Sequence, residues 1–193
     1  RQMPEEINRV LTDAVSDYLF TSSPDGDENL AREGIPKEKT YLVGNIMIDS
    51  LLSNLEKAKK TSILERLGLL LKTHSHILMN HNRSPVIPYG LLTLHRPSNV
   101  DDRGSFSKII KGVRKLAVQI PILFPIHPRT RKQIKAFNME EAFIFHSIPN
   151  LKPEAYTQGN VLVNKIHCFE PFGYLDFLNI MAHAKIVFTD SGG

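Results

Sequence analysis

The stretch GLLTLHRPSN, residues 90–99, decides how the second half of this chain folds. It is a short apolar run that ends abruptly at His95 and Arg96, and the same arrangement returns in IPILFPIHPRT (120–130) and KIVFTDSGG (185–193). Such runs are typical of buried strands. Helix-patterned segments follow the first two runs, and YLDFLNIMAHA precedes the third. This alternation predicts an α/β fold with a parallel sheet.

Polar or small residues follow each of these three predicted strands. They are His95 and Arg96, His127 and Arg129, and Asp190, Ser191, Gly192 and Gly193. Ligands of parallel α/β sheets bind beyond the carboxyl ends of the strands, so we expect these residues to line one crevice. Cationic side chains, free N–H groups at a helix start and glycines without a Cβ all suit a phosphate group. The residues alone leave two alternatives open, a phosphate site and ordinary tight turns.

The N-terminal part begins with a predicted helix in MPEEINRVLTDAVSDYLF (3–20). Its apolar positions recur with helical spacing and define the face that we expect to be buried: Ile7, Val10, Leu11, Ala14, Val15 and Tyr18. Glu5 and Glu6 fall in the first turn, where the helix dipole favours acidic side chains. A short helix in ENLAREG, a strand around TYLVGN and a helix in IMIDSLLSNLEKAKK follow. We expect one domain to end near residue 55, a junction over 56–86 and a second unit over 87–193.

Composition narrows the class of protein. The chain has 193 residues, 41% of them hydrophobic, and a net charge of +4 that is scattered among acidic residues, which favours small anionic ligands over nucleic acid. Its lone cysteine, Cys168, fits a reducing compartment, so we expect a cytoplasmic protein. No apolar stretch reaches membrane-spanning length, so we expect no membrane partner. His74, His76 and His81 lack acidic or cysteine partners at ligand spacing, and we assign no metal. The first residue is not Met, and we expect a piece of a longer protein.

Several motifs occur in one order along nearly the whole chain: MPEEINRVLTD, ENLAREGI, VGNIMIDSLL, LLTLHRPSNVDD, ILFPIHPRTR, EPFGYLDFLNIMAHA and VFTDSGG. Together they resemble the non-hydrolysing UDP-N-acetylglucosamine 2-epimerase family. The resemblance implies a GT-B architecture, in which two Rossmann-like domains face a cleft. Residues 1–55 would then be the end of the first domain, and 87–193 the first part of the second, UDP-binding domain.

The resemblance also implies an isomerase that interconverts UDP-GlcNAc and UDP-ManNAc by inversion at C2. UDP is eliminated to leave 2-acetamidoglucal and is added back after reprotonation from the other face, without a cofactor. Such a path needs carboxylates near C2 and cations at the departing diphosphate. A cytoplasmic homodimer that serves cell-surface polysaccharide biosynthesis is implied in the same way.

The family motifs assign roles to individual residues of this chain. Two residues are expected to be catalytic, Glu5 in PEEINR, with Asn8 beside it, and His95 at the phosphates. The expected substrate-binding residues are Arg9, Arg96, His127, Arg129, Phe177, Ser191, Gly192 and Gly193. Among them, Phe177 would pack near the uracil, and His127 would contact an additional UDP-GlcNAc, as is reported for some members.

Each assignment has a plainer alternative. Glu5 could only stabilise a helix turn, Phe177 could be a core residue, and Asp190 is expected to brace its turn by hydrogen bonds. At the level of function, the alternatives are a GT-B hydrolase or glycosyltransferase and a non-catalytic sugar-nucleotide sensor. Two further family carboxylates belong to motifs upstream of Arg1, and the Gln-Glu-Glu that follows the final glycines in the family is absent from this sequence. The more widespread HRRE pattern is HRPS here.

Overall fold

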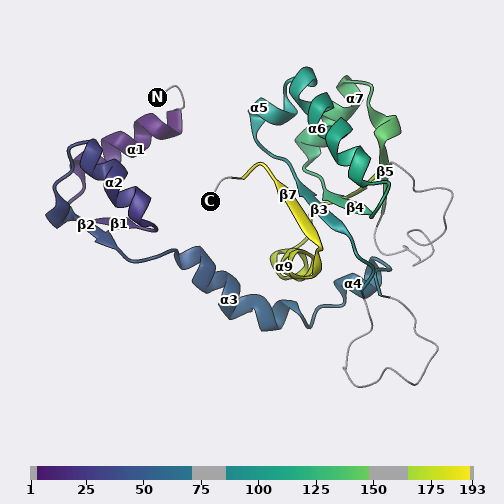
Figure 1. The fold of residues 1–193 in the computed structure, drawn as a ribbon, viewed down its shortest axis with the longest axis horizontal. Helices are drawn as coiled ribbons and strands as arrows, with labels where there is room; N and C mark the ends of the chain where they lie inside the picture. The colour runs from purple at the N-terminus through teal and green to yellow at the C-terminus, as the bar shows by residue number, and fades with distance from the viewer. Residues whose placement is uncertain (1–3, 71–85, 148–164, 192–193) are drawn as a thin grey trace. The chain divides into compact units, whose positions relative to one another are not determined.

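A computed structural model describes residues 4–70, 86–147 and 165–191. The chain divides into two compact units, Arg1–Asn54 and Leu55–Gly193, so the boundary lies within helix α3 (Ile46–Ala58). Figure 1 shows the elements of each unit. In the described part of the chain, no helix is long and apolar enough to cross a membrane.

Unit 1 contains two short parallel strands and the helices around them. Its elements before α3 are α1 (Pro4–Val15), β1 (Leu19–Thr21), α2 (Pro24–Arg32), η1 (Lys37–Lys39) and β2 (Thr40–Leu42). Strands β1 and β2 pair with Leu19 opposite Thr40. The predicted first helix was therefore too long, because Leu19 and Phe20 leave it to form the ladder with β2.

The prediction that the apolar face of α1 is buried is wrong within the described residues of unit 1. Within residues 4–54, no residue of α1 is buried, and Ile7, Leu11 and Val15 are 50%, 62% and 82% exposed. The half-buried side of the helix instead includes Glu6, Arg9, Val10 and Asp13. The physical reason is that charged side chains, and not apolar ones, join α1 to α2. Spacing predicted the helix correctly but not which of its faces contacts the unit.

Unit 2 is built on a five-stranded parallel sheet with the order β5-β6-β4-β3-β7. Its strands are β3 (Gly90–Thr93), β4 (Ile122–Pro125), β5 (Phe143–Phe145), β6 (Ile166–Phe169) and β7 (Ile186–Thr189). Its helices are α4 (Ile63–Arg66), α5 (Pro97–Val100), α6 (Arg103–Leu116), α7 (Pro128–Ala136), η3 (Glu140–Ala142) and α9 (Tyr174–His183). The α/β fold with a parallel sheet is confirmed, and the three predicted strands are neighbours in it.

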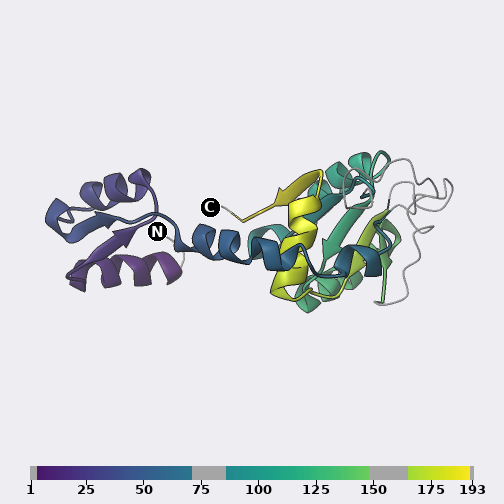
Figure 2. The same cartoon turned by 90° about the horizontal axis from the view of Figure 1, so that it is seen from below.

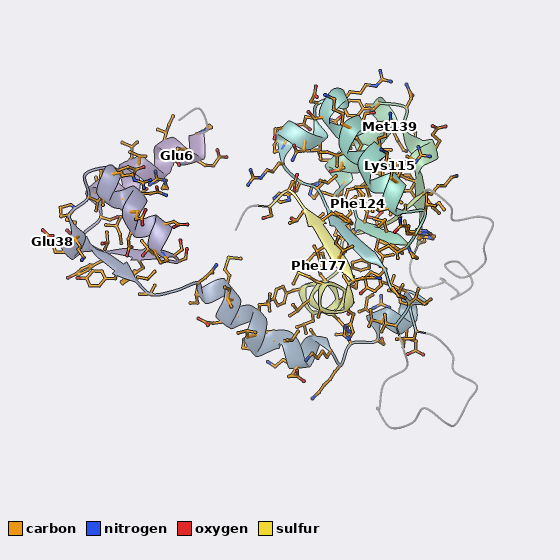
Figure 3. All side chains as sticks on the ribbon, in the orientation of Figure 1. Glu6, Glu38, Lys115, Phe124, Met139 and Phe177 are labelled. Carbon is orange, nitrogen blue, oxygen red and sulfur yellow. The ribbon has the colours of Figure 1, made fainter. Side chains whose placement is uncertain are left out.

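Alternate residues of the strands pack into two cores on opposite faces of the sheet. On one face Leu92 and Phe124 join Phe106 and Ile110 of α6, and Figure 3 shows Phe124 between the sheet and that helix. On the other face Leu91 and Leu123 pack with residues of α4 and α9, and Figure 2 shows α9 lying across the sheet. Side chains within residues 63–70, which we placed in a junction, belong to this second core. The helices on both faces leave the ends of the strands open for a ligand.

A tight contact at the start of β3 gives a test of this packing. A Cβ added to Gly90 would lie 2.7 Å from Cδ1 of Ile122, a side chain that is fully buried. We expect Gly90→Ala to lower the free energy of unfolding by about 1–3 kcal/mol, the usual cost of overpacking. Gly112 in α6 is the matched control, because a Cβ there meets nothing within 4 Å. Gly112→Ala should stabilise the helix by up to about 1 kcal/mol. Urea denaturation of both variants measures the difference, and a Gly90→Ala protein as stable as wild type would contradict the packing.

Candidate functional site

The carboxyl ends of β4, β3 and β7 lie side by side, because these strands are neighbours in the sheet and all run parallel. The register pairs Thr93 with Thr189, so the residues after each strand face one another across that pair. The structure therefore brings together the clusters that follow β3 and β7, with the cluster after β4 next to them. Gly192 and Gly193 lie outside the described residues.

Asp190 joins the turn after β7 to the turn after β3. Its carboxylate accepts hydrogen bonds from the backbone N–H of Arg96 at 2.9 Å and from that of His95 at 3.1 Å. The side-chain amide of Asn99 donates to the same carboxylate at 3.0 Å. Nδ1 of His95 lies 3.0 Å from the other carboxylate oxygen. Asp190 does act through hydrogen bonds, as predicted, but those that the structure describes brace the turn after β3 and not its own turn.

The ends of β3 and β7 leave several groups accessible. The side chain of His95 is 60% exposed, and that of Asp190 only 7%. The Arg96 side chain is also exposed, and among the described residues its guanidinium forms no ion pair. Ser191 donates its N–H to Oγ1 of Thr189 at 3.0 Å, which fixes the backbone at Ser191. This edge presents an imidazole and a guanidinium to an approaching ligand.

His127 and Arg129, after β4, are held by contacts that the sequence did not predict. His127 caps α7, and its Nδ1 accepts the N–H of Arg129 at 3.2 Å. The Arg129 guanidinium forms an ion pair with Asp101, which also accepts a hydrogen bond from Gln133 at 3.1 Å. Arg129 is thus engaged by a carboxylate of the β3–α6 connection. The sequence did offer a partner for Arg129, because the NVDD motif that contains Asp101 is acidic.

Phe177 lies in the first half of α9, where it is partly buried and packs against the second core (Figure 3). Phe177 thus contributes to the core, as its plainer alternative states. Near it, at the ends of β5 and β6, a cleft of about 330 Å³ opens. The cleft is lined by Arg66, Arg131, Phe145, His146, Ser147, Glu170, Pro171, Phe172, Gly173 and Asp176. The sequence analysis missed it because neither β5 nor β6 was recognised as a strand.

Two ion pairs border this cleft. Arg131 pairs with Glu170 at 2.6 Å and lies over the ring of Phe145, 4.9 Å from its centroid. Arg66 of α4 pairs with Asp176 of α9 at 3.3 Å. Both arginines keep more than a third of their side chains exposed, so the cleft offers planar cations beside an aromatic ring.

A pair of histidines lies under one side of the cleft. Nε2 of His146 is 2.8 Å from Nδ1 of His167, with the ring planes within 5° of parallel. Burial and, to a smaller extent, the neighbouring His146 together lower the pKa of His167 to about 4. Burial also lowers the pKa of His146. Both rings are therefore neutral at neutral pH, and one of them donates to the other.

In unit 1, Arg9 is surrounded by carboxylates. It pairs with Glu6 at 2.8 Å, Asp13 at 2.6 Å and Glu33, the C-cap residue of α2, at 2.7 Å. The hydrogen bonds to Glu6 and then to Glu33 raise the pKa of the guanidinium. Arg9 therefore ties α1 to α2, a role that the sequence analysis did not predict.

Glu5 and Glu6 differ in their surroundings although they are adjacent in α1. Glu6 pairs with Arg9, and Figure 3 labels it at the start of the helix. Glu5 is exposed and has no hydrogen bond or ion pair in the described part of the chain. The structure therefore leaves the Glu5 carboxylate available for a ligand.

Comparisons with known proteins agree with one another. All of residues 1–193 match the family described as UDP-N-acetylglucosamine 2-epimerase. The chain is similar to the UDP-N-acetylglucosamine 2-epimerases of Methanocaldococcus jannaschii (37% identity) and Methanococcus maripaludis (35%), covering all of this chain and 45% of each relative. The solved structure of the M. jannaschii enzyme in complex with UDP-GlcNAc and UDP matches with a TM-score of 0.72 at 35% identity, over all of this chain and 45% of that one. The chain spans about half the length of the curated relatives it matches.

Proposed function

The chain belongs to the UDP-N-acetylglucosamine 2-epimerase family, and we propose that the full-length protein interconverts UDP-GlcNAc and UDP-ManNAc by inverting C2. The observation that carries the proposal is the sheet edge where His95, Arg96 and the turn at Ser191 meet. The M. jannaschii relative, at 35% identity, was solved with UDP-GlcNAc and UDP bound. The substrates of this protein would then be UDP-GlcNAc and UDP-ManNAc, with UDP as the group that leaves and returns.

The diphosphate is proposed to bind at the ends of β3 and β7. His95 and Arg96 supply cationic donors. The Ser191 hydroxyl and the Gly192 N–H are proposed as neutral donors, because the Ser191 N–H is already bound to Thr189. Gly192 and Gly193 have no Cβ to hinder a phosphate. These donors stabilise the negative charge that develops on UDP as its bond to C1 breaks. The exposure of the His95 and Arg96 side chains supports this role.

Phe177 and the cleft at the ends of β5 and β6 are proposed to receive the uridine end. Phe177 is anchored in the core, which would make it a rigid side of that site. Three assignments depend on the family resemblance alone. They are His127 as a contact of an additional UDP-GlcNAc, and Arg9 and Arg129 as substrate ligands. Because Arg9 and Arg129 already hold carboxylates, we propose that they act by positioning α1 and the β3–α6 connection.

Glu5 is proposed as an acid/base group at C2. Inversion requires the C2 proton to leave one face of the sugar and a proton to return to the other face. Carboxylates perform such transfers when they are held within hydrogen-bonding reach. The two epimers have the same oxidation state, so the reaction needs no redox cofactor. We also propose a cytoplasmic homodimer, as the resemblance implies.

Isotope exchange tests the proposed reaction. We expect the full-length protein, incubated with UDP-GlcNAc in heavy water, to place deuterium at C2 of both epimers, because the C2 proton must exchange with solvent. NMR of the sugar ring measures the exchange. Free sugar with UDP would indicate a hydrolase instead, and binding of UDP-GlcNAc without exchange would indicate a sensor. Either result would overturn the proposal.

A further inference from the structure

We propose that Asp190 is a positioning residue that sets the ring tautomer and the orientation of His95. The role of the His95 ring in catalysis rests on the proposed function. The contact between Asp190 and His95 does not depend on that function. Asp190 ends β7 and His95 follows β3, so the contact joins two neighbouring strands at the candidate site.

Among the described residues, three groups donate hydrogen bonds to the Asp190 carboxylate, the backbone N–H groups of His95 and Arg96 and the amide of Asn99. One oxygen, Oδ1, receives the backbone N–H of His95 at 3.1 Å and lies 3.0 Å from Nδ1 of the same residue. The other, Oδ2, receives the N–H of Arg96 at 2.9 Å and the amide of Asn99 at 3.0 Å. Since no proton is needed on either oxygen, the site suits an ionised carboxylate.

The charge balance agrees with this geometry. Burial by itself raises the pKa of Asp190, but the hydrogen bonds from Asn99, Arg96 and His95 and the charge of His95 outweigh it, and the pKa is lowered. Asp190 is therefore an anion at neutral pH and can only accept hydrogen bonds. The ring nitrogen that faces it must carry the proton.

This arrangement fixes what His95 presents to a ligand. Because Nδ1 lies 3.0 Å from a carboxylate oxygen, a lone pair on Nδ1 would be repelled and a proton there is favoured. The neutral ring then has its lone pair on Nε2, and only the imidazolium carries a proton there. Asp190 stabilises that imidazolium by its charge. The ring has no second orientation that keeps this contact, so Nε2 is directed away from Asp190. Diphosphate oxygens would thus meet a cationic Nε2–H donor in a fixed place.

Replacing Asp190 by Asn keeps the shape of the side chain but replaces one of its two accepting oxygens with an NH₂ group. We expect the remaining oxygen to take the Oδ2 position, because it can accept there from the N–H of Arg96 at 2.9 Å, the amide of Asn99 at 3.0 Å and the N–H of His95 at 3.2 Å. The new NH₂ group then faces the His95 ring. An NH₂ group at Nδ1 favours the opposite tautomer, with the proton on Nε2. The variant should therefore alter the chemistry of His95 without removing the residue.

The test is ¹⁵N NMR of the histidine rings in the full-length protein at about pH 9, where histidine is neutral. We expect wild-type His95 to be protonated at Nδ1 and the Asp190→Asn variant to be protonated at Nε2. We also expect kcat to fall by about 10–100-fold, a loss typical of residues that orient a histidine, with a smaller change in KM. Asn99→Ala is the control, because it removes one donor to Asp190 and leaves the carboxylate facing His95; its tautomer should not change.

These measurements test the positioning role of Asp190 separately from the proposed epimerase activity. A wild-type ring protonated at Nε2 would overturn it without any variant, as would an Asp190→Asn protein that keeps the wild-type tautomer. The same is true if Asn99→Ala loses as much turnover as Asp190→Asn. If the tautomer changes as expected in a protein that lacks epimerase activity, the positioning role holds and the proposed function fails.

Discussion

Replacing Glu5 by Gln is expected to lower kcat by about 10²–10⁴-fold, the loss typical of a missing acid/base group. Gln keeps the size and hydrogen-bonding capacity of the side chain but cannot take up or release a proton at C2. Glu5 is exposed in the first turn of α1 and has no polar partner in residues 4–54, so its substitution should change the melting temperature little. Steady-state kinetics with UDP-GlcNAc measure kcat and KM for the variant.

Glu6→Gln is the matched control one residue away. Successive side chains of an α-helix diverge by about 100°, so both carboxylates cannot face the same ligand. Glu6 is engaged with Arg9, which also holds Asp13 and Glu33, so its loss weakens the link between α1 and α2. We expect Glu6→Gln to cost some stability and to keep kcat within a few-fold of wild type. Equal losses of kcat at both positions, or a larger loss at Glu6, would show that the motif was assigned wrongly.

The strand-end clusters were predictable because they depend on chain order and on the rules of parallel sheets. Apolar runs that end in His95, His127 and Asp190 mark strands, and the carboxyl ends of parallel strands share one edge. The bracing role of Asp190 followed from its place in a turn. Its partners did not, because they belong to another strand, and only the neighbouring positions of β3 and β7 identify them.

The ionic contacts of the arginines were not predictable from local patterns. Arg9 reaches Glu33, 24 residues away, and Arg129 reaches Asp101, 28 residues away. Spacing along a helix suggests only near neighbours, such as Glu6 and Asp13 for Arg9. The same limit applies to the buried face of α1, since helical periodicity shows which side chains share a face and not what that face meets. Strand β5 was missed because Phe143–Phe145 is only three residues long.

Replacing His95 by Ala is expected to lower kcat by about 10²–10³-fold, as for a lost donor to a developing negative charge. The side chain is 60% exposed, and Asp190 keeps its bonds to Arg96 and Asn99, so the melting temperature should change little. His183→Ala is a suitable control, because within the described residues that ring is hydrogen-bonded to the backbone carbonyl of Asn179, one helical turn away. Its kcat should stay within a few-fold of wild type. Deuterium exchange at C2 should slow together with turnover in His95→Ala, because departure of UDP and loss of the C2 proton belong to the same elimination. Near-normal kcat with an unchanged melting temperature would remove His95 from the site and leave Arg96 and the backbone N–H groups as the donors to the diphosphate.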